Sequence, residues 1–405
     1  MPMPEPNELK QRACQVLDQL APHMEAIASD IHAHPETGWD TPRSAARLQE
    51  FVAEYGMEVE RGVAGLHCAF RAATPGRARG THPAVCFLAE YDALPGLGHA
   101  CGHNLIGTVA SAAGIAVSKV LEEAGIPGVA YVMGTPFEEG GGGKIVMVDE
   151  GIFDVADASL MFHPGGGGHV RVGAPNIAAH MLKFSFHGKS AHSGAAPHEG
   201  INAADAAMLT FTAINAMRQH VTGDVRIHGI ITKGGEAANI VPAETEISMS
   251  VRAINHRVLM GVVERVRNCA RAGAMAAGCR LDIEETPTFK ERLVLQSYRE
   301  LVCDNLPALG LAVPASDPQQ YASADSGNVS YRIPHLTFNL PVSEEEAVAP
   351  HTPAFAVATD SDMARQAMNQ ATKLMAMAAI DLLTDPERMA AIQAEHRQKL
   401  ADAEA

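Results

Sequence analysis

The stretch 89–104 constrains the fold of this chain most, because it places several candidate metal ligands on one loop. It follows an apolar run, 85–88, that has the length and composition of a buried strand, and it precedes a helix that begins near Leu105. The side chains of interest on the loop are Glu90, Asp92, His99, Cys101 and His103. Because ligands in α/β proteins bind at the carboxyl ends of strands, the stretch predicts a metal site at one edge of a sheet.

Two further apolar segments occur in the same context. The segments 85–88, 129–133 and 158–162 run into loops that carry, respectively, Glu90 and Asp92, Glu138 and Glu139, and His163. Helical patterns lie between them, at 105–123 and at 144–150. Alternation of strands and helices predicts a largely parallel sheet, with the polar residues gathered at one of its edges.

The pattern changes after Gly173. The expected order is β-α-β-β-α-β, with elements near 181–187, 202–218, 226–232, 244–253, 258–276 and 280–285. This is the order of a ferredoxin-like split unit. We therefore predict an α/β fold in which a mixed, mostly parallel sheet domain, 1–178 and 290–405, is interrupted by an inserted α+β ferredoxin-like domain, 179–289.

Composition excludes several classes of partner. With 31 basic and 47 acidic residues the chain has a formal charge of -16, which would repel nucleic acid and anionic membrane surfaces. The first ten residues lack the apolar core of a signal peptide, and no run approaches the ~20 apolar residues of a membrane span. Seven scattered cysteines without a Cys-x-x-Cys pair indicate neither a disulfide framework nor a zinc knuckle. We expect a cytoplasmic protein with no nucleic-acid or membrane partner.

The strand-end loops, together with a histidine far along the chain, supply the donor types that zinc and manganese prefer. The candidate ligands are Cys101, His103, Glu139, His163 and His351. Five ligands exceed the set of one tetrahedral catalytic zinc, but they suit two ions roughly 3.5–4 Å apart, with Cys101 or Glu139 as the bridge. We therefore expect two divalent metal ions per chain, manganese or zinc, with cobalt also possible.

Glu138 would then be free to act as a general base beside Glu139, which the metal holds. Each signal has a plainer explanation when it is taken alone. A Glu-Glu pair usually lies on a solvated surface, and His163 before Pro164 could simply end a strand. Their placement after three expected strands favours the metal site.

These motifs resemble the aminoacylase/carboxypeptidase family of dinuclear metallopeptidases, and within it the amidohydrolase branch that includes p-aminobenzoyl-glutamate hydrolase. The segments that carry the resemblance are 32–38, 92–104, 135–140, 163, 187–198, 239–242 and 351–353. The resemblance implies a catalytic α/β domain and an inserted lid domain through which two chains dimerise. It also implies the five ligands named above, Glu138 as general base, and Asp92 as the acid that orients a ligand histidine.

In the lid, the segment 188–192 matches a family motif whose histidine, here His192, would stabilise the oxyanion of the reaction. Asn239 and Arg252 match the family's contacts to a substrate carboxylate, for which an arginine fork is chemically apt. Glu90 stands where many family members have histidine, and Asn104 replaces an aspartate of many relatives. The resemblance assigns no role to His32 or His34. It leaves two possibilities for Asp325, which could hydrogen-bond a metal ligand or cap a turn.

The predicted function is that of a metal-dependent amidohydrolase. It would cleave an N-acyl or N-aroyl amide of an amino acid or dipeptide with a free carboxylate, by a metal-bound hydroxide with Glu138 as general base. Hydrolytic deamination of a small amino-aromatic acid at the same metal site is the alternative reaction. If the protein is not an enzyme, the alternative is a non-catalytic relative that binds metal. Dimerisation through the lid rests on the resemblance.

Overall fold

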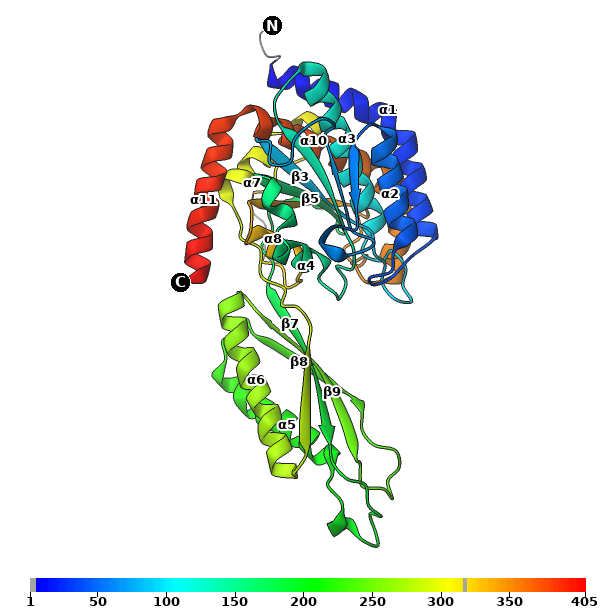
Figure 1. Ribbon diagram of the computed structural model, residues 1–405, viewed down its shortest axis with the longest axis vertical. Helices are drawn as coiled ribbons and strands as arrows, with labels where there is room; N and C mark the ends of the chain where they lie inside the picture. The colour runs from blue at the N-terminus through cyan, green and yellow to red at the C-terminus, as the bar shows by residue number, and fades with distance from the viewer. Residues whose placement is uncertain (1–4, 316–318) are drawn as a thin grey trace. The chain divides into compact units, whose positions relative to one another are not determined.

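The computed structural model describes residues 5–315 and 319–405, which fall into two compact units (Figure 1). The first unit contains the chain up to Pro175, then Arg292–Gln320 and Asp325–Ala405. The second unit contains Asn176–Glu291, together with the short segment Tyr321–Ala324. This segment was not expected in the insertion; the carbonyl of Ala322 accepts a hydrogen bond of 3.1 Å from the amide of Ile177, which attaches it there.

The first unit is built on a seven-stranded sheet in the order β1-β2-β4-β3-β5-β11-β6. The strands are β1 (Glu58–Arg61), β2 (Phe70–Ala73), β3 (Ala84–Glu90), β4 (Val129–Thr135), β5 (Ala158–Gly165), β6 (Arg171–Val172) and β11 (His335–Pro341). The central strands β4, β3, β5 and β11 are mutually parallel, whereas β1, β2 and β6 are antiparallel to their neighbours. The predicted mixed, mostly parallel sheet is confirmed.

The antiparallel strands were not predicted. β1 is a four-residue strand with three charged side chains, and β6 has only two residues, so neither carries a usable hydrophobic pattern. They become strands because they pair with β2 and β11, which a sequence window cannot show. All three lie outside the parallel core that positions the candidate ligands.

Helices pack around this sheet (Figure 1). They are α1 (Pro6–Ala33), α2 (Pro42–Glu54), α3 (His103–Ala124), α4 (Gly143–Asp149), α7 (Gln296–Cys303), α8 (Ser326–Ser330), α9 (Pro353–Ala358), α10 (Asp362–Thr384) and α11 (Pro386–Glu404). α3 is rich in alanine and glycine, so it packs closely against β3 and against the long helices α1 and α10. It alone among the described helices is long and apolar enough to cross a membrane, but 94% of its apolar window is buried inside the unit, as in a core helix.

The second unit has the predicted ferredoxin-like order. Its elements are β7 (Ala178–His187), α5 (Ala203–Met217), β8 (Arg226–Lys233), β9 (Glu244–Ala253), α6 (His256–Ala277) and β10 (Arg280–Glu285). The strands form an antiparallel sheet in the order β10-β7-β9-β8, with both helices packed on it. Strict alternation of buried and partly exposed residues along β9 shows that one face of the sheet meets the helices.

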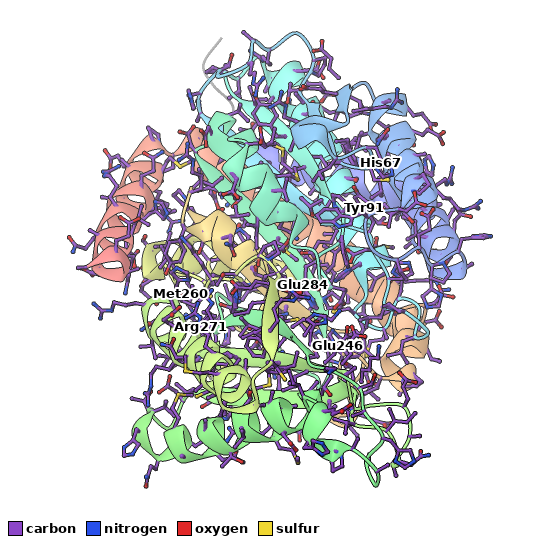
Figure 2. All side chains as sticks on the ribbon, turned by 60° about the horizontal axis from the view of Figure 1, so that its bottom comes forward. His67, Tyr91, Glu246, Met260, Arg271 and Glu284 are labelled. Atoms are coloured by element: carbon purple, nitrogen blue, oxygen red, sulfur yellow. The ribbon has the colours of Figure 1, made fainter. Side chains whose placement is uncertain are left out.

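Charged side chains occupy the other face of this sheet. Figure 2 labels Glu246 on β9 and Glu284 on β10, which flank Lys183 on the strand between them. Nζ of Lys183 lies 3.2 Å from Oε1 of Glu246 and 3.7 Å from Oε1 of Glu284. Cross-strand pairs of this kind fix the register of the sheet at its solvated face.

Candidate metal centre

The predicted ligands of the first unit converge at the carboxyl ends of its parallel strands. β3 ends at Glu90, β4 ends at Thr135 just before the Glu138–Glu139 pair, and His163 lies near the end of β5. His103 is the first residue of α3, which begins where the loop after β3 ends. Because these strands are parallel and adjacent, their carboxyl ends share one edge of the sheet.

Two groups of three donors share the thiol of Cys101. The first group contains Sγ of Cys101 with the imidazoles of His103 and His163. The second contains the same Sγ with the side chains of Glu139 and His351. Within each group the donor atoms lie within 4.8 Å of one another. Sγ of Cys101 is 3.5 Å from Nε2 of His163, and Nε2 of His351 is 3.4 Å from Oε1 of Glu139. A third group, formed by His103, Glu138 and Glu139, shares Glu139 with the second, so Cys101 and Glu139 each belong to two groups of donors.

Asp92 hydrogen-bonds both His103 and the backbone of the Glu138–Glu139 pair. It accepts a hydrogen bond of 3.3 Å from Nδ1 of His103, which leaves Nε2 of that ring free to face the donors. Its two carboxylate oxygens also accept hydrogen bonds of 3.2 Å from the amides of Glu138 and Glu139. A carboxylate that fixes the outward nitrogen of a ligand histidine is the usual companion of a protein metal site.

The backbone is strained at two places beside the cluster. Phe137, which precedes the two glutamates, has φ of 53°, and His351 has φ of 67°. Non-glycine residues in this region cost of order 1–3 kcal/mol and persist only where surrounding contacts hold them. The amide of His351 donates to the carbonyl of Ala100 at 2.8 Å, which ties this distant segment beside Cys101.

The adjacent carboxylates differ in their pKa. Burial raises the pKa of Glu138 well above its usual value, and the charges of Glu90 and Glu139 add to the shift. Burial acts in the same direction on Glu139, but the hydrogen bond from His351 and the charge of His103 outweigh it and lower its pKa to about 2. Glu139 is therefore an anionic ligand, while Glu138 is the carboxylate that readily holds a proton.

Burial and the neighbouring charges also shift the pKa values of the other donors, His163, His103 and Cys101. Burial lowers the pKa of His163, so this ring is neutral with an available lone pair. Burial also opposes protonation of His103, but the charges of Glu90 and Asp92 prevail and raise its pKa. Burial and the charge of Glu139 raise the pKa of the Cys101 thiol. An arrangement that favours an imidazolium and disfavours a bare thiolate equally favours a divalent cation bound to both residues.

A buried polar atom supports this assignment. Nε2 of His103 has no hydrogen-bond partner within the described part of the chain, although it is shielded from solvent. Buried polar atoms without partners are costly unless a ligand or ion satisfies them. The donor set, with one thiol, three imidazoles and one carboxylate, matches the chemistry of zinc and related divalent ions. The residues therefore fit a divalent metal centre.

The other predicted functional residues belong to the second unit. His192 and Asn239 lie on two loops that meet through a hydrogen bond of 3.1 Å from the amide of Ser193 to the carbonyl of Asn239. Arg252 lies near the opposite end of β9 from these loops, which follow β7 and precede β9. Its Nη1 donates to the carbonyl of Tyr321 at 3.1 Å. The structure thus brings His192 and Asn239 together but places Arg252 apart from them.

Three residues without an assigned role now have neighbours. Nε2 of His32 lies 2.8 Å from the carbonyl of Ala356, and Nδ1 of His34 lies 2.8 Å from the carbonyl of Asp30, so both rings bind backbone. Asp325 binds Lys144, a residue that the sequence had placed only in a short helix. Glu90, one of the side chains of interest on the loop 89–104, also contacts Lys144, which had not been assigned to the site.

Comparison with known proteins agrees with the resemblance seen in the sequence. Residues 175–276 match the model of the peptidase dimerisation domain of the M20 family. The chain is 33% identical over 409 residues to Xaa-Arg dipeptidase of Mus musculus, covering 97% of this chain and 93% of that protein. It is 36% identical over 278 residues to a polypeptide of the p-aminobenzoyl-glutamate hydrolase of Escherichia coli, covering 63% of this chain and 57% of that polypeptide.

A solved structure shares the fold. The YXEP protein of Bacillus subtilis, described as a dinuclear metal binding peptidase, superposes with a TM-score of 0.64 at 18% identity, covering 90% of this chain and 99% of that one. The likeness extends over both units, and the relatives matched by sequence are named as a dipeptidase and a hydrolase. The chain is therefore an enzyme of the M20 family of metal-dependent peptidases and amidohydrolases.

Proposed function

We propose that this enzyme hydrolyses an N-acyl or N-aroyl amide whose amine half is an amino acid or dipeptide with a free carboxylate. The observation that carries the proposal is the position of Glu138. Its carboxylate lies 4.0 Å from Nε2 of His103, next to the candidate ligands, yet its neighbour Glu139 is the one that bonds His351. A carboxylate with a raised pKa beside a metal centre is suited to general acid–base catalysis.

Two divalent ions held by Cys101, His103, Glu139, His163 and His351 would polarise the scissile carbonyl and lower the pKa of an attacking water. Glu138 would take a proton from that water at its carboxylate and deliver it to the nitrogen of the leaving amine. Its raised pKa suits both transfers, because a group that binds a proton readily can carry it between two sites. We propose zinc or manganese, since the thiol of Cys101 suits zinc.

His192 is prepared to donate a hydrogen bond. Its Nδ1 accepts hydrogen bonds of 3.1 Å from the amides of both Gly194 and Ala195, so the neutral ring carries its proton on Nε2. The side chain is exposed, so Nε2–H can meet a ligand. We propose that it binds the carbonyl oxygen of the substrate as negative charge develops there.

Asn239 and Arg252 would bind the substrate carboxylate, and their positions bear on how the enzyme assembles. Arg252 is eight residues along β9 from Glu244, the end nearest His192, which at about 3.3 Å per residue is roughly 26 Å. A small amide cannot contact both ends of this strand. We therefore propose a homodimer in which Arg252 of one chain and His192 with Asn239 of the other serve the same substrate, consistent with the match to a dimerisation domain.

The named relatives suggest which amides to assay first. Xaa-Arg dipeptides and p-aminobenzoyl-glutamate both have an amino acid with a free carboxylate on the amine side of the scissile bond. The formal charge of -16 favours the approach of the cationic dipeptide. Both classes should therefore be compared as kcat/KM, together with N-acyl amino acids and, as the alternative reaction, amino-aromatic acids.

Glu138→Gln tests the assignment of the base. We expect the variant to keep its metal and lose roughly 10²–10⁴-fold in kcat, because the amide cannot carry the proton. Glu150→Gln, at an exposed position after α4, serves as the matched control and should retain full activity. If Glu138→Gln keeps its metal and turns over amides at a rate near that of the parent, Glu138 is not the base.

A further inference from the structure

A buried cluster of charged residues lies behind the metal centre and has no part in the chemistry above. Lys144 and Asp325 have fully buried side chains, and that of Glu90 is 1% exposed. Nζ of Lys144 lies 2.7 Å from Oδ1 of Asp325 and 2.5 Å from Oε1 of Glu90. Burying a lysine between two carboxyl groups is expensive unless the groups compensate one another, so the cluster is a specific feature of the fold.

The cluster connects three segments of the first unit that are far apart in sequence. Glu90 ends β3, Lys144 follows the glycine-rich loop after Glu139, and Asp325 immediately precedes α8. Asp325 also accepts a hydrogen bond of 3.0 Å from the amide of Lys144. The loop that carries Glu138 and Glu139 is therefore held at one side by Asp92 and at the other by Asp325.

The cluster reaches the metal centre through Glu90. While Oε1 of this carboxylate faces Lys144, its Oε2 lies 3.4 Å from Nε2 of His103, the nitrogen that faces the other ligands. The charge of Glu90 also acts on Arg292, which donates from Nη1 to the carbonyl of Ala174 at 2.9 Å. Of these basic groups, Lys144 contacts both acids, Glu90 and Asp325.

We propose that Lys144 and Asp325 form a pair of opposite charges that sets the affinity of the neighbouring centre for divalent ions. Glu90 lies between this pair and His103, and its carboxylate contacts both Lys144 and His103. Lys144 and Asp325 are positioning residues and touch neither substrate nor metal. The proposal rests on the metal centre proposed above. Its physical basis is that removing one member of a buried balanced pair leaves a whole charge in a poorly screened interior close to a divalent cation.

The two members of the pair should have opposite effects. Lys144→Met removes a positive charge, so the centre becomes more negative and should bind a divalent ion more tightly. Asp325→Asn removes a negative charge and should weaken binding. We expect shifts on the order of tenfold in Kd in each direction, given the strength of unit charges at this range. The double variant Lys144→Met/Asp325→Asn should return close to the parent value.

The measurement is the Kd of the full-length protein for zinc and for manganese, obtained by competition with a chromophoric chelator. The control is Lys10→Met, which breaks a largely buried ion pair of 2.5 Å with Asp381 elsewhere in the same unit, and should leave Kd unchanged. Melting curves of the metal-free proteins show whether each variant is folded. If Lys144→Met does not fold, Arg292→Met removes a second positive charge on which the charge of Glu90 acts, and should also tighten binding.

The sign of the shift separates this proposal from a merely structural role. General damage to the loop would weaken metal binding in both single variants, and the double variant would be worse than either; that result would overturn the proposal. If the parent protein itself bound neither ion, the metal centre would be wrong instead. Because the readout is binding, neither outcome depends on knowing the substrate.

Discussion

Glu138 and Glu139 show how a single residue acquires its role from its neighbours. Both side chains are largely shielded from solvent, and the backbone amides of both residues donate hydrogen bonds to the carboxylate of Asp92. Of the two, Glu139 faces His351. The charges around them move their pKa values in opposite directions. This division of labour between adjacent carboxylates is what a general base beside a metal ligand requires.

His335 provides a residue-scale prediction about pH. Its ring is buried between hydroxyl groups, with Nδ1 2.8 Å from Oγ of Ser159 and Nε2 2.9 Å from Oγ1 of Thr337, and burial lowers its pKa well below the usual value. The unfolded chain binds a proton at this histidine below pH ~6.5, but the folded chain does not. Stability should therefore fall with decreasing pH below ~6.5, by about 1.4 kcal/mol per pH unit from this residue.

Urea denaturation of the parent and of His335→Gln at several pH values between 5 and 7.5 checks this prediction. Glutamine keeps hydrogen-bonding groups in place but does not titrate. The free energy of unfolding of the variant should fall less steeply below pH ~6.5 than that of the parent. Parallel curves for the two proteins would show that His335 is not neutral in the folded state.

At the scale of the elements, a close backbone approach constrains the start of α4 at Gly143, where the loop after β4 ends. A Cβ added at Gly143 would lie 1.8 Å from the carbonyl oxygen of Pro136, a contact that only backbone movement can relieve. Gly143→Ala should therefore lower the free energy of unfolding by about 1–3 kcal/mol and reduce kcat, because the loop carries Glu138.

Gly261→Ala is the matched control for that substitution. Gly261 lies in α6 with nothing within 4 Å of its added Cβ, so alanine should stabilise the protein by about 0.5–1 kcal/mol. Thermal or urea denaturation of the two variants should give changes of opposite sign. A Gly143→Ala protein as stable and as active as the parent would show that the loop is not held as described.

The sequence predicts elements best where the hydrophobic pattern is local. β9 and β10 have the predicted limits, and the parallel strands were placed because each is a short apolar run before a polar loop. β1, β2 and β6 were missed because their pairing partners define them. The charged, alanine-rich C-terminal residues predict a solvated helix with a loose end; they form the helix α11, but Met389 and Ile392 on it are buried.

The same limit applies to the candidate site. Histidine, cysteine and paired acids after strands are recognisable in a sequence, and the structure brings Cys101, His103, Glu139 and His351 together. Lys144 has no such signal, because a lysine at the start of a short helix is normally a surface residue. Its burial is caused by partners 54 and 181 positions away, Glu90 and Asp325, which only the fold brings near.

At the scale of the whole molecule, the proposed dimer predicts complementation between two defective variants. His192→Ala and Arg252→Ala should each be nearly inactive as homodimers. In a mixed dimer, one site receives the intact Arg252 and the intact His192 from different chains, whereas the other site lacks both. Co-expression should therefore recover about a quarter of the parent activity if chains pair at random and each interface is isologous.

Size-exclusion chromatography with light scattering should accompany this assay, so that the mixed species is known to be dimeric. Activity of the mixture no higher than that of either variant alone would place both side chains in the same subunit's site. A monomer with full activity would remove the partner chain from the mechanism.

Elemental analysis tests most directly whether Cys101, with the four other candidate ligands, would hold two divalent ions in one hydrolytic centre. Protein purified without added metal, alongside an equal preparation of Cys101→Ala, should contain close to two divalent ions per chain in the parent and fewer in the variant, since the thiol belongs to two of the three groups of donors at this centre. No zinc or manganese in the parent, even after incubation with either ion, would contradict the account.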